Sequence, residues 1–306
     1  MAGRSKDPTF LHYDAHQAST YAEERSSYPV PLYNTLLDFH AKSGGQFGSL
    51  LDVGCGHGAA TRDLAVHFDK TVGVDPSPEM VNVARKIGGK SKESDVRFEV
   101  SGAEDCKGAV DSETKDFDMI ISAMAAHWFD MGRFWETAAS LLKPNGTVGL
   151  WTMSSLYCHP STHNASEVQK ILFHLEREIL DPHELPGNRV SRDMYDNLPL
   201  PWQTSPTVPA FPPALFERVE WNRDGSVDGN GEFLGGNQAT TLENLEKGLA
   251  TASMVTRWRD AHPELVGTPQ DCVSQTISAL REALEGNESF VNGASTTLLM
   301  FKKRIG

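Results

Sequence analysis

Residues 49–151 repeat one pattern, in which a short apolar run is followed by a turn and then by an amphipathic stretch of helix length. This alternation predicts βαβ units, whose parallel strands form a sheet covered by helices. Strands are expected at 49–53, 71–75, 96–101, 117–123 and 147–151, and helices at 59–67, 78–87 and 132–142. The predicted fold class is therefore α/β, with a doubly wound and mostly parallel sheet.

The pattern changes after residue 151. Residues 181–213 contain 8 of the 17 prolines of the chain, a density that prevents a continuous helix or a central strand. We expect a long surface segment there that forms a lid over a pocket. Further helices are expected at 166–180, 242–262 and 269–284, and residues 295–301 have the character of a strand that returns to the sheet.

Composition excludes several classes of function. The chain has 28 Lys and Arg against 41 Asp and Glu, a formal net charge of −13, and this acidic balance argues against binding nucleic acid or an anionic membrane surface. The longest apolar stretch, 119–129, is too short to span a bilayer. Residues 1–8 are polar with no apolar stretch behind them, so neither a secretory signal nor an anchor is expected.

The cysteines indicate the compartment. All four are scattered along the chain and form no C-x-x-C pair, which favours reduced thiols and a cytoplasmic location. They are Cys55, Cys106, Cys158 and Cys272. No metal site is expected, because Pro160 interrupts the helical spacing of His159 and His163 and no third ligand is evident.

A glycine-rich turn at 54–59 lies between the first predicted strand and helix, where glycine lets a ligand approach the backbone closely. Its first two glycines and Ala59 fit the relaxed dinucleotide pattern G-x-G-x-x-G/A, and Asp75 follows at the distance expected of a ribose-binding acid. Asp52 favours a different nucleoside, because a carboxylate at that place suits an amine or a cation and repels a pyrophosphate. The third glycine is Gly58, which gives G-x-G-x-G.

The motif D-x-G-x-G-x-G at 52–58 resembles that of Rossmann-like S-adenosylmethionine-dependent methyltransferases. The resemblance continues at 74–77 with Met80 downstream, at 103–104, through the fourth predicted strand and at 142–146. Five ordered motifs favour this family over a nicotinamide-dependent dehydrogenase. The resemblance implies a seven-stranded sheet and S-adenosyl-L-methionine as cofactor. The cofactor-binding residues it implies are Asp52, Gly54, Cys55, Gly56, Gly58, Asp75, Pro76, Met80, Ala103, Glu104 and Ser122.

The same resemblance assigns roles to some of these residues. The three glycines would line the methionine part of the cofactor, Asp75 would accept from both ribose hydroxyls, and Ala103 and Glu104 would lie beside the adenine. Two alternatives stay open, since Asp75 could cap a helix and Glu104 could serve structure alone.

Within that superfamily the chain is more similar to trans-aconitate methyltransferases and related fungal small-molecule methyltransferases. Three stretches carry this similarity: Tyr-x-x-x-Arg-x-x-Tyr-Pro at 21–29, Ala-Ala-His-Trp-Phe at 125–129, and a weaker match at 253–263. The family often has proline where this chain has Ser26. The candidate substrate-binding residues are Tyr21, Arg25, Tyr28, Trp128, Trp202, Arg257 and Trp258, and the candidate catalytic residues are His127 and Trp128.

The nucleophile decides what else the site needs. A carboxylate is ionised at neutral pH and needs no general base, only groups such as Arg25 and Arg257 to seat it. A hydroxyl, thiol or amine of a natural product would need a proton acceptor, for which His127 is the best placed. His127 could instead hydrogen-bond a backbone group, and Arg257 could form a surface ion pair. A regulatory subunit that binds the cofactor without transferring a methyl group is the alternative outside the enzymes.

These observations predict an enzyme that methylates a small acidic molecule, as a monomer or homodimer. Residues 1–40 are expected to form an N-terminal cap segment and 41–152 the cofactor-binding core. Residues 153–290 are expected to form a substrate-cap insert with additional helices, and 291–306 the final strand of the core sheet.

Overall fold

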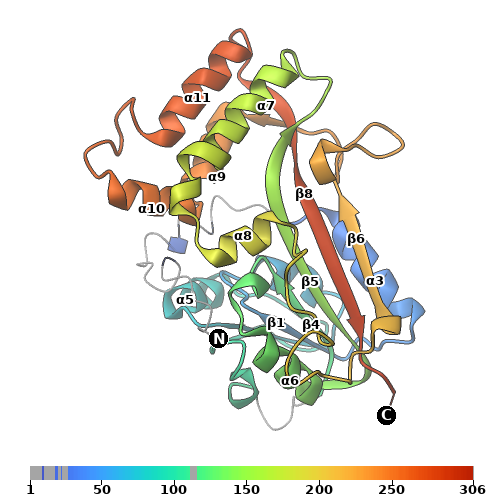
Figure 1. Ribbon diagram of the computed structural model, residues 1–306. Coiled ribbons are helices and arrows are strands. Elements are labelled where there is room, and N and C mark those ends of the chain that lie inside the picture. The colour runs from blue at the N-terminus through green and yellow to red at the C-terminus, as the bar shows by residue number, and fades with distance from the viewer. Residues whose placement is uncertain (1–8, 10–17, 20–21, 23–26, 111–115, 306) are drawn as a thin grey trace.

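The computed structural model describes residues 9, 18, 19, 22, 27–110 and 116–305. Its centre is a sheet in the order β3-β2-β1-β4-β5-β8-β6, with the short strand β7 paired to β8 outside this path (Figure 1). The strands are β1 (Ser49–Val53), β2 (Lys70–Asp75), β3 (Arg97–Val100), β4 (Phe117–Ala123), β5 (Leu142–Cys158), β6 (Phe216–Trp221), β7 (Ala239–Thr241) and β8 (Ser289–Lys302). Neighbouring strands from β3 to β5 are parallel, and β8 runs antiparallel between β5 and β6. The predicted doubly wound, mostly parallel sheet is confirmed.

Helices follow the strands in the expected alternation. They are α3 (Val30–Lys42), α4 (Ala59–Ala65), α5 (Pro78–Ile87), α6 (Met131–Leu141), α7 (Ala165–His174), α8 (Pro186–Arg192), α9 (Leu242–Ala250), α10 (Ser253–Ala261) and α11 (Cys272–Ala283). Two of the core helices begin at side-chain caps: the Ser77 hydroxyl accepts from the Met80 amide, and the Asp130 carboxylate accepts from the Arg133 amide. Among the described residues, no helix is both long enough and apolar enough to cross a membrane.

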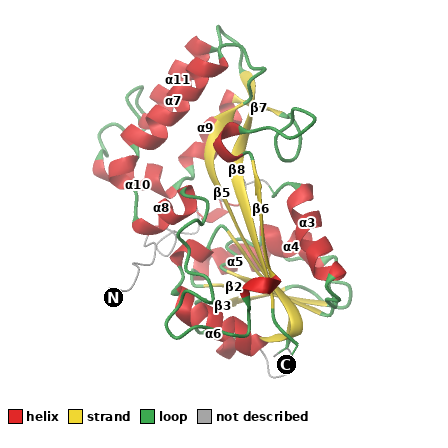
Figure 2. Cartoon of the chain, turned by 45° about the vertical axis from the view of Figure 1, so that its right-hand side comes forward, coloured by secondary structure: helices red, strands yellow, loops and turns green. Residues whose placement is uncertain are grey.

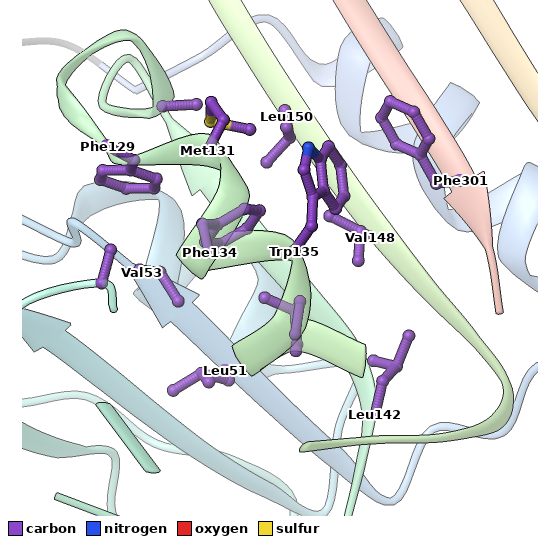
Figure 3. Close-up of a cluster of buried hydrophobic side chains, with 14 of the residues drawn as sticks. Leu51, Val53, Phe129, Met131, Phe134, Trp135, Leu142, Val148, Leu150 and Phe301 are labelled. Carbon is purple, nitrogen blue, oxygen red and sulfur yellow. The ribbon is translucent and has the colours of Figure 1, made fainter. Parts of the chain in front are cut away.

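Apolar side chains pack on both faces of the sheet. On one face, α3 and α4 bring Leu36 and Leu64 against Trp151 of β5. On the other, α6 places Phe134 and Trp135 against the sheet, and Figure 3 shows both within this apolar cluster. Trp135 is fully buried, and its indole N–H donates to the carbonyl of Pro199 at 3.0 Å. The proline-rich segment is therefore tied to the core.

The strands β5 and β8 are much longer than the others and pair over most of their length, so that both extend beyond the core sheet (Figure 2). Around their far ends α7, α9, α10 and α11, which we call the distal helices, bury a second apolar cluster that includes Phe290 of β8. One pair of strands thus belongs to the cofactor-binding core and to the distal helices.

The structure differs from the sequence prediction in several elements. Strand β5 runs over Leu142–Cys158, well beyond the expected 147–151, and the expected helix 166–180 is α-helical only to His174. The expected helix 242–262 is two helices, because the chain leaves helical geometry before Ser253 and the Thr251 hydroxyl donates to the Gly248 carbonyl at 2.7 Å. Residues 216–221, inside the range expected to form the cap insert, are strand β6 of the main sheet. The proline-rich segment contains α8, with Pro186 at the first helical position, where no backbone N–H is needed.

Replacing Trp135 tests how much the packing of this core contributes to the free energy of unfolding. Trp135→Ala removes a fully buried indole and one hydrogen bond, so we expect the free energy of unfolding to fall by about 3–5 kcal/mol. Urea denaturation followed by circular dichroism measures this. Val66→Ala, at a side chain that is 59% exposed, should change stability by less than about 0.5 kcal/mol. Equal losses in the two variants would contradict the packing described.

Candidate active site

A cavity lies at the carboxyl ends of β1, β2 and β4, where ligands bind in doubly wound sheets. It is lined by Tyr28, Gly54, Cys55, Gly56, His57, Ala59, Ala60, Asp75, Pro76, Ser77, Met80, Gly102, Ala103, Glu104, Ala123, Met124, Ala125, Trp128 and Phe129. The turn after β1 and Asp75 at the end of β2 contribute backbone and a carboxylate, and Tyr28, Trp128 and Phe129 contribute aromatic walls.

The glycine turn is held against the end of β2. The amides of Gly54 and Cys55 both donate to the Val74 carbonyl, at 2.8 and 3.0 Å, and the Gly56 amide donates to Asp75 Oδ2 at 2.9 Å. Gly54 has a φ of 71°, and a Cβ there would stand 2.5 Å from the Cβ of Ala125. Gly56 has a φ of 54°, and a Cβ there would meet nothing within 4 Å, although the residue lines the cavity. The turn therefore presents bare backbone to the cavity at Gly56.

Asp75 borders the cavity at the end of β2. Its two carboxylate oxygens accept from the amides of Gly56 and Ser77, at 2.9 and 2.8 Å. Burial outweighs these hydrogen bonds and raises the pKa of Asp75 to about 6. The carboxylate is thus fixed in orientation before any ligand arrives.

Asp52 is fully buried behind the turn and is not among the residues that line the cavity. Its Oδ2 accepts from the Thr61 hydroxyl at 2.6 Å, whereas Oδ1 has no hydrogen-bond partner within the described part of the chain. Burial, with a smaller contribution from the charge of Asp75, raises the pKa of Asp52 to about 7. A buried carboxyl with one unsatisfied oxygen favours a cationic or hydrogen-donating partner nearby.

The remaining cofactor candidates divide into two groups. Cys55, Pro76, Met80, Ala103 and Glu104 line the cavity. Gly58 and Ser122 do not: a Cβ on Gly58 would stand 2.7 Å from the Phe98 ring, so this glycine serves packing, and Ser122 is fully buried in β4. The sequence missed the cavity residue Met124, whose φ of 55° at the end of β4 has no local sequence signal.

Two of the substrate candidates lie at the cavity. Trp128 and Tyr28 line it, and Tyr28 packs edge-on against Trp151 with ring centroids 5.4 Å apart. Tyr21 and Arg25 lie outside the described residues. Phe129, next to Trp128, is a further aromatic wall that the motif 125–129 already contained.

The other substrate candidates lie away from the cavity lining. Trp202 packs on Phe216 and Phe301 at the sheet, and Trp258 stacks on His262 with centroids 4.5 Å apart. The Arg257 guanidinium forms hydrogen bonds with other parts of the chain. Its Nε donates to the His183 carbonyl at 2.8 Å, its Nη2 to Asn188 Oδ1 at 2.6 Å and its Nη1 to the Thr9 hydroxyl at 3.0 Å.

His127 is buried beside Trp128, with ring centroids 4.9 Å apart, and is not part of the cavity lining. Its Nδ1 lies 3.2 Å from the hydroxyl of Tyr195, which donates to the Trp151 carbonyl at 3.3 Å. With the Tyr195 proton directed at that carbonyl, the contact is made by the tautomer of neutral His127 that carries its proton on Nδ1. Sequence reasoning missed Tyr195, which lies 68 residues from His127 in a turn without a motif.

The chain resembles known methyltransferases over this region and beyond it. Residues 50–146 match a family model described as "Methyltransferase domain". The "Probable S-adenosylmethionine-dependent methyltransferase CRG1" of Saccharomyces cerevisiae is 26% identical over 292 residues, which cover 94% of this chain and 77% of that protein. "Methyltransferase cfoB" of Aspergillus candidus is 27% identical, over 71% of this chain and 67% of its own length.

A solved structure shares the fold. A protein from Anaeromyxobacter dehalogenans assigned as a type II methyltransferase superposes with a TM-score of 0.62 and 24% identity, covering 92% of this chain and 98% of its own. The domain match spans the glycine turn, Asp75 and the walls that follow β4, and the relatives that align with most of the chain are named as methyltransferases. The chain is an S-adenosylmethionine-dependent methyltransferase.

The cavity fits the cofactor of this class. Gly56 offers bare backbone, Asp75 a fixed carboxylate for hydroxyl groups, and Met80 and Ala103 apolar surface for a planar base. The unsatisfied oxygen of Asp52 adds negative character behind the turn, which suits a ligand with a sulfonium and an amino group. Among the described residues, no three His, Cys, Asp or Glu side chains come together as metal ligands.

The raised pKa of Asp52 predicts a pH dependence of stability. A carboxyl whose pKa rises on folding stabilises the protein fully below its unfolded pKa and loses that contribution as the pH rises through the folded value, near 7. Asp52→Asn keeps an oxygen for Thr61 and does not titrate. Between pH 4 and 7 we therefore expect the wild type to lose stability relative to Asp52→Asn, by up to about 1.4 kcal/mol for each pH unit. Urea unfolding at several pH values measures this, and parallel curves would contradict the burial of the charge.

Proposed function

We propose that this enzyme transfers a methyl group to a carboxylate oxygen of a small molecule bound beside the aromatic walls of the cavity, as in the trans-aconitate methyltransferases that its motifs resemble. The observation that carries the proposal is the composition of these walls. Tyr28, Met124, Trp128 and Phe129 line the cavity, whereas His127 does not line it and its Nδ1 faces Tyr195. Such a site suits a nucleophile that is already ionised, because no proton has to be removed.

The residues toward the cofactor have separate tasks in this proposal. Gly54 and Gly56 let the backbone approach the methionine portion, Asp75 accepts from ribose hydroxyls, and Met80 and Ala103 pack on the adenine. When bound, S-adenosylmethionine supplies an electrophilic methyl group carried by a sulfonium. Tyr28, Trp128 and Phe129 hold the acceptor in line and exclude water, which favours the neutralisation of an anion against a cation.

The position of Arg257 changes one part of this picture. Its guanidinium joins the turn at His183, helix α8 and Thr9, so it positions the segments around the cavity and is not a lining residue. The proposal assigns the seating of the substrate carboxylate to Arg25 of the N-terminal segment. Ala18, a described residue earlier in the chain, packs on Met80 of the cavity lining.

A hydroxyl acceptor is the second candidate. It is favoured by the hydrogen bond from His127 Nδ1 to Tyr195, which leaves the ring lone pair on Nε2 as a general base requires. This candidate needs His127 Nε2 to reach the acceptor, and the buried ring is not among the residues that line the cavity.

The proposed role of Asp75 has a direct test. Asp75→Asn retains one oxygen for the amides but loses the charge, so the affinity for S-adenosylhomocysteine should fall about 10- to 100-fold, as for loss of a charged hydrogen bond. Isothermal titration calorimetry measures this. Asp63→Asn is the matched control, because Asp63 does not line the cavity and accepts a hydrogen bond of 2.9 Å from the Tyr33 hydroxyl. This variant should leave the affinity within about twofold of wild type. Equal affinity of Asp75→Asn and the wild type for S-adenosylhomocysteine would show that Asp75 does not contribute to cofactor binding.

The acceptor class is tested with isotopically labelled S-adenosylmethionine and a panel of small carboxylic acids, phenols, thiols and amines. We expect a base-labile methyl ester from acids. His127→Asn keeps a donor toward Tyr195 and removes Nε2, so ester formation should stay within about threefold of wild type, whereas a base-dependent acceptor would lose about 100-fold. If the wild-type enzyme forms labelled products from phenols or thiols and His127→Asn does not, the second candidate is supported. No labelled product from any acid would contradict the carboxylate proposal.

A further inference from the structure

Helix α8 lies against Trp128, one of the aromatic walls of the cavity, through a glycine. Gly187 is buried, and a Cβ built on it would stand 2.4 and 2.5 Å from Cζ3 and Cε3 of the Trp128 indole. No side chain at position 187 other than hydrogen therefore fits with the indole where it stands. Sequence reasoning gave this glycine no role, since it lies in the proline-rich segment, 59 residues after Trp128 (187 − 128).

The helix is fixed from the side opposite the indole. Arg189 and Arg192 both pair with the carboxylates of Asp181 and Glu184, with N···O distances between 2.7 and 3.1 Å. The side chains of Arg192 and Glu184 are only 13% and 4% exposed, so this pair lies largely out of solvent, whereas Arg189 and Asp181 are half exposed. Charged hydrogen bonds in such a setting resist displacement.

The same helix is also attached to β5. The hydroxyls of Ser191 and Thr152 are 2.5 Å apart, and the Ser154 hydroxyl donates to the Arg192 carbonyl at 2.5 Å. Asn188 attaches the other end to helix α10, because its Nδ2 donates to the Ser253 hydroxyl at 3.3 Å and its Oδ1 accepts from Arg257 Nη2 at 2.6 Å. Both ends of α8 are held, so an added methyl group at residue 187 cannot be relieved by moving the helix outward without breaking these bonds.

The Trp128 indole is the group that can move to relieve this clash. Its backbone is fixed by the bond from its amide to the Ala125 carbonyl at 3.0 Å, but its ring lines the cavity. Restoring normal carbon–carbon contact from 2.4 Å requires the ring to move by roughly 1 Å. The open direction for that movement is the cavity.

We propose that Gly187 is a positioning residue that sets the width of the acceptor end of the cavity through the place of the Trp128 indole. This inference rests on the proposed function in one respect, namely that the acceptor binds beside Trp128. A side chain at 187 narrows the space for the acceptor and leaves the cofactor end, built by the turn 54–58 and Asp75, unchanged. The acceptor class it selects is that of small acids whose breadth the glycine just permits.

The test compares Gly187→Ala with Gly248→Ala in the full chain. Both glycines lie in helices, but a Cβ on Gly248 would meet nothing within 4 Å, so that variant controls for the backbone effect of the substitution. The first measurement is a crystal structure of Gly187→Ala with S-adenosylhomocysteine. We expect the Trp128 ring to move into the cavity by about 1 Å with α8 in place. A stationary ring together with a displaced α8 would overturn the proposal.

The second measurement is the KM and kcat for straight-chain and branched carboxylic acids of increasing breadth. For Gly187→Ala we expect the KM of the broad acids to rise at least tenfold more than that of the narrow ones, with S-adenosylhomocysteine affinity within twofold of wild type. Adding Trp128→Phe, which replaces the indole by a smaller ring, should restore the broad acids. A uniform change across the series, or no rescue, would contradict the role in acceptor width.

The two proposals fail in different ways. If wild-type enzyme methylates none of the acids, the carboxylate proposal fails, and the ring position in the Gly187→Ala crystal structure still decides the inference about Gly187. If wild-type enzyme methylates the acids and Gly187→Ala behaves as Gly248→Ala does, only the inference about Gly187 fails.

Discussion

The site depends on the hydrogen bonds that hold the turn after β1 against the end of β2. The Val74 carbonyl accepts from two successive amides, and Asp75 accepts from the next one, at Gly56. Three consecutive N–H groups directed at one neighbouring strand require positive φ at Gly54 and Gly56, which glycine adopts at little cost. The turn cannot be moved without disturbing the sheet edge, so the cavity has a rigid end against which the other walls are placed.

Two buried carboxyls beside this turn lower the stability of the folded protein when they are ionised, but they favour the binding of a cationic ligand. Burial raises the pKa of both Asp52 and Asp75, which means that the free protein destabilises their charged forms relative to those of exposed carboxyls. A cationic ligand reverses this preference, because its charge stabilises the carboxylates. The free energy that the fold forgoes by burying these acids is thus recovered when such a ligand binds, a common arrangement at functional sites.

The sequence predicted the elements with strong local patterns. Strand β1, helix α5 with Pro78 at its start, and the glycine turn all lie where the pattern predicts them, because buried strands, proline and glycine constrain the backbone locally. The sequence could not predict which distant residues meet. The Tyr195 contact with His127, the Gly187 contact with Trp128 and the engagement of Arg257 away from the cavity all result from long-range packing, which no periodicity encodes.

The long pairing of β5 with β8 has a consequence for how the molecule comes apart. Ten paired positions run without a change of partner from Thr147, in the core, to Cys158, beside the distal helices, with one shift in register between Met153 and Leu156. Hydrogen bonds of a shared ladder cannot open at one end while both neighbouring apolar clusters stay packed on it. The distal helices and the cofactor-binding core should therefore behave as one cooperative unit, with amide hydrogens of β8 protected to a similar degree along its length.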